Sequence, residues 1–441
     1  MTKAMTVAAC DKLVIVNPKR GAASLSGRDC WFPYYAGFSS KFAGQLIASS
    51  QLAPGAILMD PWNGSGTTTS AALLNGHKPV GFDVNPVMAV VAKARLLPQS
   101  EICSVPPLLA DIVAKAKCTK RQPQVGDPLT IWFTPNAAVA VRSIERAIYR
   151  LLVSADQDED ALDSAGDLST LAAFFYVALF RAVRSLVHPF RASNPTWIIR
   201  PVSPNCRIKP KASKVWQCFS DYVTQMVSNS SSMLEKPKRR ASDFTIKVAS
   251  SDNLPLGRET VDFVLSSPPY CTRIDYGIAT LPELSVLGFE VNKRLGELRA
   301  RLIGTPTVQS DTPEPSNSWG NACVDLLERV SNHRSKAARS YYYKTYVQYF
   351  SAMSHSFSEL GRCLKRRGQC ILVVQDSYFK DVHVDLATIF AEMGRAAALD
   401  LCHQVDFPIN RTLGSVNLKS RRYRRLSSAT ESVLCFVKSA C

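Results

Sequence analysis

The pentapeptide Ser266-Ser267-Pro268-Pro269-Tyr270 combines residue types that could hold a planar ring by its face and by its amine. It follows Val261-Asp262-Phe263-Val264-Leu265, an apolar run typical of a buried strand. Each proline fixes its own φ and restricts the residue before it, so the loop keeps one backbone shape. We expect the Ser267 hydroxyl and a carbonyl near Pro268 to accept from an exocyclic amine while the base stacks on Tyr270. The alternative is an ordinary Pro-Pro turn after a core strand.

A second stretch could approach the phosphates or sugar of a nucleotide-like ligand. Asp60-Pro61-Trp62-Asn63-Gly64-Ser65-Gly66-Thr67-Thr68-Thr69 follows the short apolar run at 56–59. Gly64 and Gly66 allow a tight turn and a close approach of the backbone. The helix predicted after them offers unpaired N–H groups at its first turn. No lysine follows Gly66, so the stretch is not a P-loop and a triphosphate is disfavoured. The alternative is a βαβ turn without a ligand.

Asp83 completes this pattern at the end of the next predicted strand, residues 78–83. It lies 17 residues beyond Gly66, and Asn85 with Pro86 begins another helix that continues to Arg95. In doubly wound sheets a carboxylate at this place accepts hydrogen bonds from ribose hydroxyls. The order strand, glycine loop, helix, strand, acid therefore predicts a site for a nucleoside-containing cofactor.

Further elements must position these residues. We predict an α/β fold, a Rossmann-like sheet with helices on both faces, because apolar strand-like runs alternate with helical patterns. Further strands are predicted at 244–248, 261–265, 370–376, 401–407 and 432–437. Helices are predicted from Ser39 or Ser40 to Ser49 and at 70–75, 341–364 and 384–393, with a turn at 365–368.

The middle of the chain interrupts the strand pattern. Residues 141–151 repeat apolar side chains at helical spacing, and 171–187 form a second apolar helix. We therefore predict a mostly helical insertion at 99–243, a possible target-recognition region, between the two sheet halves at 1–98 and 244–441.

The charge of the chain points to a polyanionic partner. The 441 residues include 53 lysines and arginines against 36 acidic residues, a formal net charge of +17. The loop joining the last two strands surrounds Tyr423 with basic residues, a composition that suits a nucleic-acid backbone. These basic residues are Lys419, Arg421, Arg422, Arg424 and Arg425. The alternatives are a solvated loop and a generally basic protein.

Cysteine usage argues against a zinc site and favours a reducing compartment. None of the 13 cysteines has C-x-x-C spacing, and the six histidines do not cluster with them. The first 20 residues carry charges and no long apolar core, so no secretory signal is visible. The most apolar helical run, 171–179, is too short to span a bilayer. We therefore expect a cytoplasmic protein without membrane association and without a metal site.

These motifs together resemble the S-adenosylmethionine-dependent amino-methyltransferases of DNA. The resemblance covers residues 31–98 and 244–441. Ser267-Pro268-Pro269-Tyr270 matches the family's catalytic tetrapeptide, (D/N/S)-P-P-(Y/F/W), and Asp60 to Thr68 is similar to its cofactor loop, D-P-F-x-G-S-G-T-T. Asp83 matches the acid that binds ribose.

The resemblance implies further cofactor contacts. The helix near Phe38 to Leu46, with Lys41 and Phe42, corresponds to the family's helix at the methionine end of the cofactor. Ser251-Asp252-Asn253 corresponds to the segment that contacts adenine. The implied cofactor residues are Lys41, Phe42, Asp60, Pro61, Asn63, Gly64, Gly66, Thr67, Thr68, Asp83, Asn85, Asp252 and Asn253.

The implied reaction is methyl transfer to the exocyclic amine of a base flipped out of DNA. Two acceptors would favour a pyramidal nitrogen with its lone pair aimed at the methyl group, so catalysis would rest on orientation and electrostatics. Arg273 and the basic loop would hold the DNA backbone. Cys271 follows the tyrosine and lacks the Pro-Cys pairing of enzymes that methylate carbon 5 of cytosine, so we do not expect it to act as a nucleophile.

The serine at position 267 favours N4 of cytosine, with N6 of adenine as the alternative. The order of cofactor loop, insertion and catalytic loop departs from the permuted order common among serine-variant enzymes. An RNA methyltransferase is a second alternative, disfavoured because no separate RNA-binding module is visible. A third alternative is a protein that is not an enzyme, namely a non-catalytic nucleic-acid-binding subunit. A cognate restriction or defence component is a possible partner.

Overall fold

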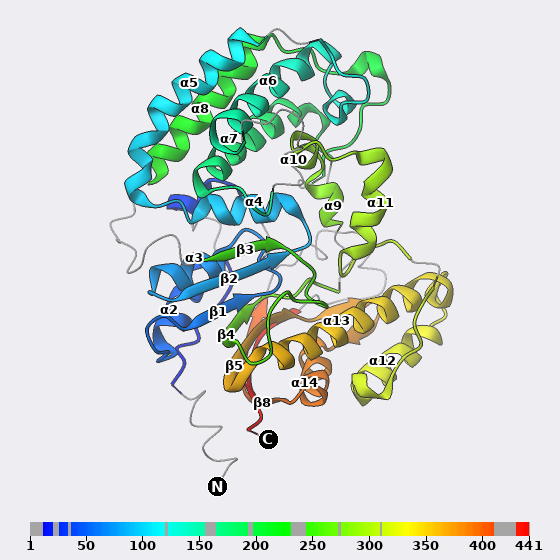
Figure 1. Ribbon diagram of the computed structural model, residues 1–441. Helices are drawn as coiled ribbons and strands as arrows, with labels where there is room; N and C mark the ends of the chain where they lie inside the picture. Colours follow the sequence, from blue (N-terminus) through cyan, green and yellow to red (C-terminus); the bar gives the residue numbers. More distant parts are fainter. Residues whose placement is uncertain are drawn as a thin grey trace.

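A seven-stranded sheet with the order β3-β2-β1-β4-β5-β9-β8 runs through the molecule (Figure 1). The computed structural model describes residues 12–20, 26–33, 37–119, 122–154, 165–192, 197–230, 244–271, 275–308, 311–409 and 429–440. Strands β1 to β5 are parallel, whereas β9 pairs antiparallel with β5 and β8. The strands are β1 Ile57–Asp60, β2 Lys78–Asp83, β3 Thr245–Val248, β4 Val261–Ser266, β5 Leu364–Gln375, β8 Leu399–Ile409 and β9 Ala429–Lys438.

The strand order reverses between β1 and β4, because the chain first adds β2 and β3 on one side and then β5 on the other. In open parallel sheets, ligands bind outside the carboxyl ends of the strands at such a switch point. The glycine loop follows β1 and the Pro-Pro loop follows β4, so the topology brings both predicted motifs to this point.

Helices cover both faces of the sheet, which confirms the predicted α/β class. Side chains alternate along a strand, so neighbouring residues of β4 enter different cores. Phe263 and Leu265 pack with helices α2 and α3, whereas Val264 packs with α13 and α14 on the other face. These helices are α2 Ser40–Ser49, α3 Thr67–Leu74, α13 Tyr343–Cys363 and α14 Leu386–Ala396.

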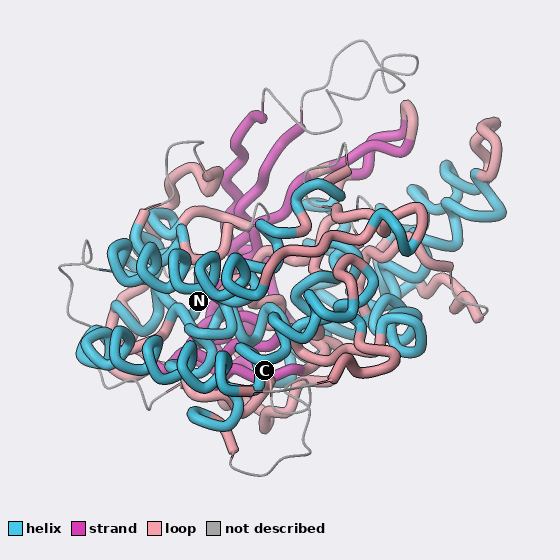
Figure 2. Tube along the Cα trace, turned by 90° about the horizontal axis from the view of Figure 1, so that it is seen from above, coloured by secondary structure: helices cyan, strands magenta, loops and turns pink. Residues whose placement is uncertain are grey.

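A helical layer stands above the sheet, and α4 is the helix of this layer beside the strands (Figure 1). Viewed from above in Figure 2, helices of this layer lie in front of the strands. The predicted insertion is mostly helical, as expected, and its apolar core continues into α10 and α11, which follow β4 in the chain. The predicted domain boundaries near residues 98 and 243 stay a prediction. The layer contains α4 Pro86–Arg95, α5 Val105–Cys118, α6 Pro135–Leu152, α7 Thr170–Leu186, α8 Ala212–Ser230, α9 Tyr276–Ala279, α10 Leu281–Val286 and α11 Val291–Arg301.

Within this layer, arginines of α6 and α7 connect these helices to α10. Arg142 of α6 is buried and pairs with Asp127 (3.0 Å) and Glu145 (3.3 Å). It also donates to the carbonyl of Val286 at 2.7 Å. Arg184 of α7 pairs with the fully buried carboxylate of Glu283. Paired and hydrogen-bonded ions of this kind are costly to break, because the partner would stay buried without compensation.

Several predicted elements differ from the observed ones. No element was predicted at 290–340, which contain α11 and α12 Asn321–Ser331; the segment is polar overall because only one stripe of each helix is buried. The turn expected at 365–368 is wrong: these residues belong to β5, where Arg367 has φ +61° and the register with β4 shifts. Helix α3 begins at Thr67, three residues earlier than expected.

Short elements complete the described chain. A hairpin of β6 Ser377–Phe379 and β7 Val382–Val384 extends from the carboxyl end of β5, and a π-helical turn at Ala338–Tyr342 precedes α13. No helix within the described ranges is long and apolar enough to cross a membrane. Short 3₁₀ turns occur at Gly27–Cys30, Gln99–Ser104, Pro128–Ile131, His188–Phe190, Pro204–Cys206 and Asn317–Trp319.

Candidate active site

A cavity opens at the carboxyl ends of β1, β2 and β4, at the switch point of the sheet. Both sequence motifs contribute to its wall, although they are about 200 residues apart in the chain. The predicted site residues that line it are Asp60, Pro61, Asn63, Gly64, Thr67, Asp83, Asn85, Ser267, Pro268, Pro269 and Tyr270.

The glycine loop depends on backbone conformations that favour glycine. Gly64 has φ +47° and Gly66 has φ +81°, both in the left-handed region. Gly66 is also the N-cap of α3, and a Cβ added there would lie 2.9 Å from the Cβ of Ala92 on α4. The loop can therefore pack against α4 only with glycine at this position, which fixes the first turn of α3 beside the cavity.

Asp83 holds the glycine loop and the next helix together. One of its carboxylate oxygens accepts from the Gly64 N–H at 3.0 Å, and the other accepts from the Asn85 N–H at 2.8 Å. Burial raises the pKa of Asp83 to about 6, although these two hydrogen bonds act in the opposite direction. Each oxygen keeps acceptor capacity after one bond, so the carboxylate can still accept from a ligand hydroxyl.

Asp60 is a second buried acid in the cavity wall. The Ser266 hydroxyl donates to its carboxylate, and the Trp62 N–H donates at 3.1 Å. Burial raises the pKa of Asp60 to about 6 as well. Two acids of this kind in one cavity suit a ligand that brings positive charge, because such a ligand would favour their ionised forms.

The indole of Trp62 adds a donor from which no described residue accepts a hydrogen bond. Trp62 lines the cavity, and its buried Nε1–H has no hydrogen-bond partner within the described structure. Buried polar groups of this kind are generally satisfied, by protein, water or ligand. The free N–H therefore fits a ligand with an acceptor near the glycine loop.

Ser267 has an oriented hydroxyl. Its Oγ donates to the carbonyl of Val373 on β5 at 3.1 Å. The proton of the hydroxyl therefore takes part in the hydrogen bond to Val373. The lone pairs of the oxygen can still accept a hydrogen bond from a bound group. This arrangement supports one of the two acceptors expected from the sequence.

The rest of the Pro-Pro loop is attached to α13. The Tyr349 hydroxyl donates to the carbonyl of Pro269 at 2.9 Å. Tyr349 is 3% exposed, and burial raises the pKa of its hydroxyl well above the usual value, so it remains a donor at neutral pH. One carbonyl of the loop is therefore used inside the protein, and the backbone that carries Tyr270 is fixed.

Some predicted residues do not line the cavity. Lys41 is exposed on α2, whereas Phe42 is buried in the sheet core with its ring 5.2 Å from that of Phe38. Gly66 and Thr68 support the loop from behind, and the Thr68 hydroxyl donates to the carbonyl of Leu265. Two of the other predicted residues are exposed, and six lie outside the described residues.

Asp252 and Asn253 are exposed, and the preceding Ser250 and Ser251 line the cavity instead. Arg273 and the basic residues of the last loop lie outside the described residues. These loop residues are Lys419, Arg421, Arg422, Arg424 and Arg425.

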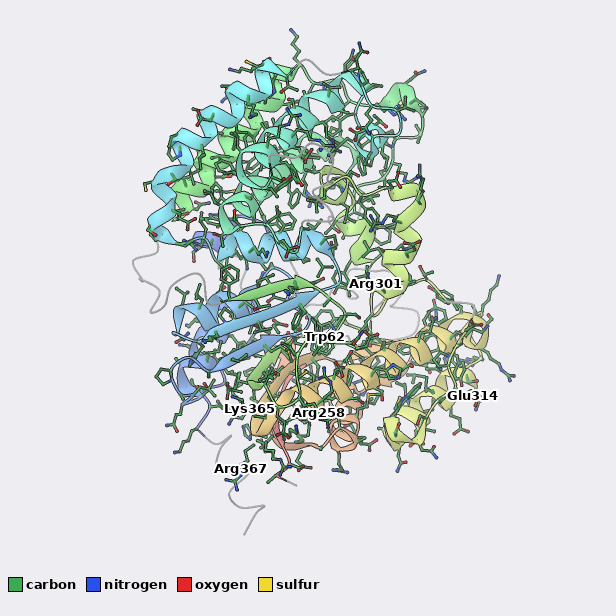
Figure 3. The ribbon with its side chains drawn as sticks, in the orientation of Figure 1. Trp62, Arg258, Arg301, Glu314, Lys365 and Arg367 are labelled. Atoms are coloured by element: carbon green, nitrogen blue, oxygen red, sulfur yellow. The ribbon has the colours of Figure 1, made fainter. Side chains whose placement is uncertain are left out.

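Sequence reasoning missed a wall of the cavity that the helical layer supplies. It comes from α9 and from the end of α11, where Tyr276, Thr280 and Arg301 line the cavity. Figure 3 shows Arg301 at the end of α11, close to the labelled Trp62 of the glycine loop. No local pattern marks these residues, because distant contacts place them.

Three contacts hold this wall. The Asn85 side-chain amide donates to Thr280 Oγ1 at 2.8 Å, and Arg184 donates to the carbonyl of Ala279 at 2.6 Å. Gly304 has φ +78°, and a Cβ there would lie 2.9 Å from the carbonyl oxygen of Tyr270. The segment after α11 therefore fits closely against the Pro-Pro loop.

No cluster of three or more His, Cys, Asp or Glu side chains with metal-binding geometry occurs among the residues that the structure describes. The acids of the cavity, Asp60 and Asp83, each accept hydrogen bonds from the surrounding backbone.

Comparisons with known proteins give short or weak similarities. No protein-family model matches the chain. The chain is 39% identical over 57 residues to "Type II methyltransferase M.BsoBI" of Geobacillus stearothermophilus, a match that covers 13% of this chain and 11% of that protein. A solved structure of a geranyl diphosphate methyltransferase in complex with GPP and sinefungin is 10% identical, with a TM-score of 0.30, and covers 98% of this chain and 93% of its own. A likeness this weak supports no conclusion.

Proposed function

We propose that this protein is a DNA methyltransferase that transfers a methyl group from S-adenosylmethionine to the exocyclic amine of a flipped base, most favourably N4 of cytosine. One observation carries the proposal: Ser267 and Tyr270 line the same cavity as Asp60, Gly64 and Asp83. An acceptor for an amine, an aromatic face for a base and a candidate cofactor loop thus come together at the switch point of one sheet.

The residues of the cavity fit the proposed cofactor. Asp83 offers acceptors for ribose hydroxyls, and the unpaired Nε1–H of Trp62 offers a donor. Asp60 and Asp83 provide negative charge near a ligand that carries a positive sulfur. When bound, S-adenosylmethionine supplies an electrophilic methyl group. The chain's own residues would hold and orient it.

The proposed role of Ser267 is to orient the amine of the base. Its hydroxyl proton is committed to Val373, so its oxygen acts as an acceptor and favours an amine lone pair that points away from it. The proposed role of Tyr270 is to stack on the base, and Tyr349 keeps the Tyr270 backbone in place through Pro269. The rate gain would come from positioning and preorganised hydrogen bonds.

The choice of DNA rests on charge and on a short likeness. The net charge of +17 favours a polyanion, and the 57-residue match is to a protein named a type II methyltransferase. The serine at position 267 favours N4 of cytosine by resemblance. A cognate restriction component is a further proposed partner.

The decisive experiment is methyl transfer with labelled S-adenosylmethionine to DNA and to RNA, followed by digestion to nucleosides. We expect label in DNA, recovered as N4-methylcytosine. Label in RNA alone would contradict the DNA substrate, and N6-methyladenine would contradict the cytosine assignment. Transfer to neither, with intact cofactor binding by calorimetry, would favour a non-catalytic binding subunit.

A further inference from the structure

A second cavity lies beside the Pro-Pro loop, on the side of Cys271. Its volume is about 200 Å³, and its wall is mostly aromatic. It is formed where the β6–β7 hairpin meets the beginning of α13. The residues that line it are Cys271, Tyr342, Tyr346, Ser377, Tyr378, Phe379 and Lys380.

The floor of this cavity is an aromatic cluster. Phe379 is 3% exposed and Tyr346 is 7% exposed, with ring centroids 6.2 Å apart. The ring of Tyr342 packs 4.8 Å from that of Phe379. These rings are held by the sheet and by α13, so the floor is preformed.

The wall formed by Tyr378 is also fixed. Its ring lies 4.8 Å from the ring of His383, and His383 Nε2 lies 2.7 Å from a carboxylate oxygen of Asp376. Asp376 in turn accepts from the Thr430 N–H of β9 at 2.6 Å. The hairpin is therefore anchored to the main sheet, and Tyr378 holds its position without a ligand.

Polar groups at the cavity suit a base and its phosphate. The Oγ of Ser377 is buried without a hydrogen-bond partner in the described chain, so it can donate to or accept from a ligand. The ammonium group of Lys380 lies 6.0 Å from the centre of the Tyr342 ring, which places a cation beside an aromatic face. Aromatic faces with adjacent cations bind single nucleotides of a strand by stacking and charge.

Size restricts the ligand. A cavity of roughly 150 Å³ accepts benzene, whereas drug-sized ligands occupy about 300 Å³ or more. The second cavity lies between these values, so one planar ring system fits and a whole cofactor does not.

We propose that the second cavity binds a nucleobase of the substrate strand next to the target base. Tyr270 lines the first cavity and Cys271, the following residue, lines the second. The two cavities therefore adjoin along one stretch of backbone. One strand that places its target base against Tyr270 can therefore place a neighbouring base against Tyr378. This inference rests on the proposed function and deepens it, because it assigns a subsite for sequence context.

Photo-cross-linking tests the proposal without knowledge of the recognition sequence. The full chain is irradiated with a pool of random-sequence DNA that contains both 5-iodouracil and 5-iodocytosine, and the cross-linked peptides are identified by mass spectrometry. We expect cross-links in the peptides that carry Tyr342, Tyr346 or Tyr378. Cross-links at Tyr270 without any at these three tyrosines would overturn the subsite and leave the proposed function standing. No cross-link to any tyrosine at either cavity would overturn both.

Variants give a second readout through affinity for the same DNA pool. Tyr378→Ala removes a stacking face, and we expect a loss of about 5- to 100-fold in affinity, with cofactor binding unchanged. Tyr378→Phe keeps the ring and should restore affinity. The matched control is Tyr343→Ala, a neighbouring half-buried tyrosine that does not line the cavity. A loss in Tyr378→Ala no greater than in the control would overturn the subsite.

A further variant guards against misfolding of Tyr378→Ala. Lys380 has φ +57° in the turn of the hairpin, a conformation that glycine adopts without strain. Lys380→Gly therefore removes the cation and preserves the turn. We expect weaker DNA binding and a smaller dependence of affinity on salt, because one phosphate contact is lost. Unchanged affinity and salt dependence would contradict the role of Lys380.

Discussion

The two halves of the first cavity are held in different ways. On the side of β1 and β2, Asp83 is fixed by backbone N–H groups of its own and the preceding loop, Asn85 and Gly64. On the side of β4, Ser267 donates to Val373 and Pro269 accepts from Tyr349, partners about 80 to 100 residues away. The first half is built from local spacing, and the second depends on the assembled sheet and α13. Substitutions in the first half should therefore lower the affinity for the cofactor, and substitutions in the second half should lower the rate of methyl transfer.

Tyr270→Ala should give the largest effect and separate the halves most clearly. Loss of the stacking face would leave the base without orientation, and we expect kcat to fall by about 100-fold or more. Cofactor affinity, measured by calorimetry, should stay within about twofold of the unchanged protein, because Asp60, Asp83 and the glycine loop are intact. A matching loss of cofactor affinity would mean that Tyr270 belongs to the cofactor half.

Asp83→Ala should give the reverse pattern. Hydrogen bonds to a charged group contribute about 1.5–3 kcal/mol, so we expect cofactor affinity to fall by about 10- to 100-fold. At saturating cofactor, kcat should be largely retained. Asp83→Asn, which keeps one acceptor, should lie between the two proteins. If calorimetry showed unchanged cofactor affinity in Asp83→Ala, Asp83 would not bind the ribose of the cofactor.

The pKa values of Asp60 and Asp83, both raised to about 6 by burial, predict a dependence on pH. A carboxylate that accepts from the cofactor must be ionised, so cofactor affinity should fall between pH 7 and pH 5, by about tenfold over this range for one carboxylate. In the protein without cofactor, the free energy of unfolding depends on pH in the opposite direction to cofactor affinity. The folded state holds protons that an unfolded aspartate, with a pKa of about 3.9, releases. The free energy of unfolding should therefore fall as pH rises from about 4 to 6.

Titration calorimetry and denaturant unfolding over pH 4 to 7 would check both signs. Asp83→Asn is the matched variant, because it removes one of the two acids, and its affinity should change less with pH. An affinity that is flat over this range would contradict the use of these carboxylates by the cofactor.

Tyr349→Phe should have the smallest effect, confined to the catalytic half. It removes the hydroxyl that donates to Pro269, and a single neutral hydrogen bond contributes about 0.5–1.5 kcal/mol. We expect a fall of a few-fold in kcat, with cofactor affinity unchanged. Tyr341→Phe is the control, because its hydroxyl donates to the carbonyl of Pro306 and not to a carbonyl of the Pro-Pro loop. Equal effects of the two variants would show that the Pro269 contact does not support transfer.

The contrast between local spacing and long-range contacts also explains which features could be predicted from the sequence. The glycine loop, Asp83 and the Pro-Pro loop are visible because the proposed site needs fixed residue types at short spacing. The sheet strands are visible because they are apolar runs. Tyr276, Thr280 and Arg301 were missed because the packing of the helical layer brings them to the cavity. Helix α11 was missed because its surface is mostly polar, and only a few of its residues, such as Val291 and Leu298, are buried.

The prediction for adenine contacts illustrates the limit of spacing. The adenine contacts were predicted at Ser251 to Asn253, but Ser250 and Ser251 line the cavity whereas Asp252 and Asn253 are exposed. A shift of one or two residues after a strand changes which side chains face a ligand, and no local pattern fixes that shift. The hydroxyl of Ser251 lies 2.8 Å from that of Ser356 on α13, a contact that only the folded chain provides.

The helices α4 to α8 form one long connection between β2 and β3, which has a consequence for how the chain can change length. Strand β2 ends at Asp83 and pairs with β3, which begins at Thr245. The entropy of closing a loop grows only with the logarithm of its length, about 0.6 kcal/mol for each doubling, so about 160 intervening residues cost only about 2 kcal/mol more than a twelve-residue crossover. Insertions or deletions at the far side of the layer therefore change the folding free energy of the sheet very little. The outer helices of this connection can therefore change in length while α4, which lines the cavity, keeps its place.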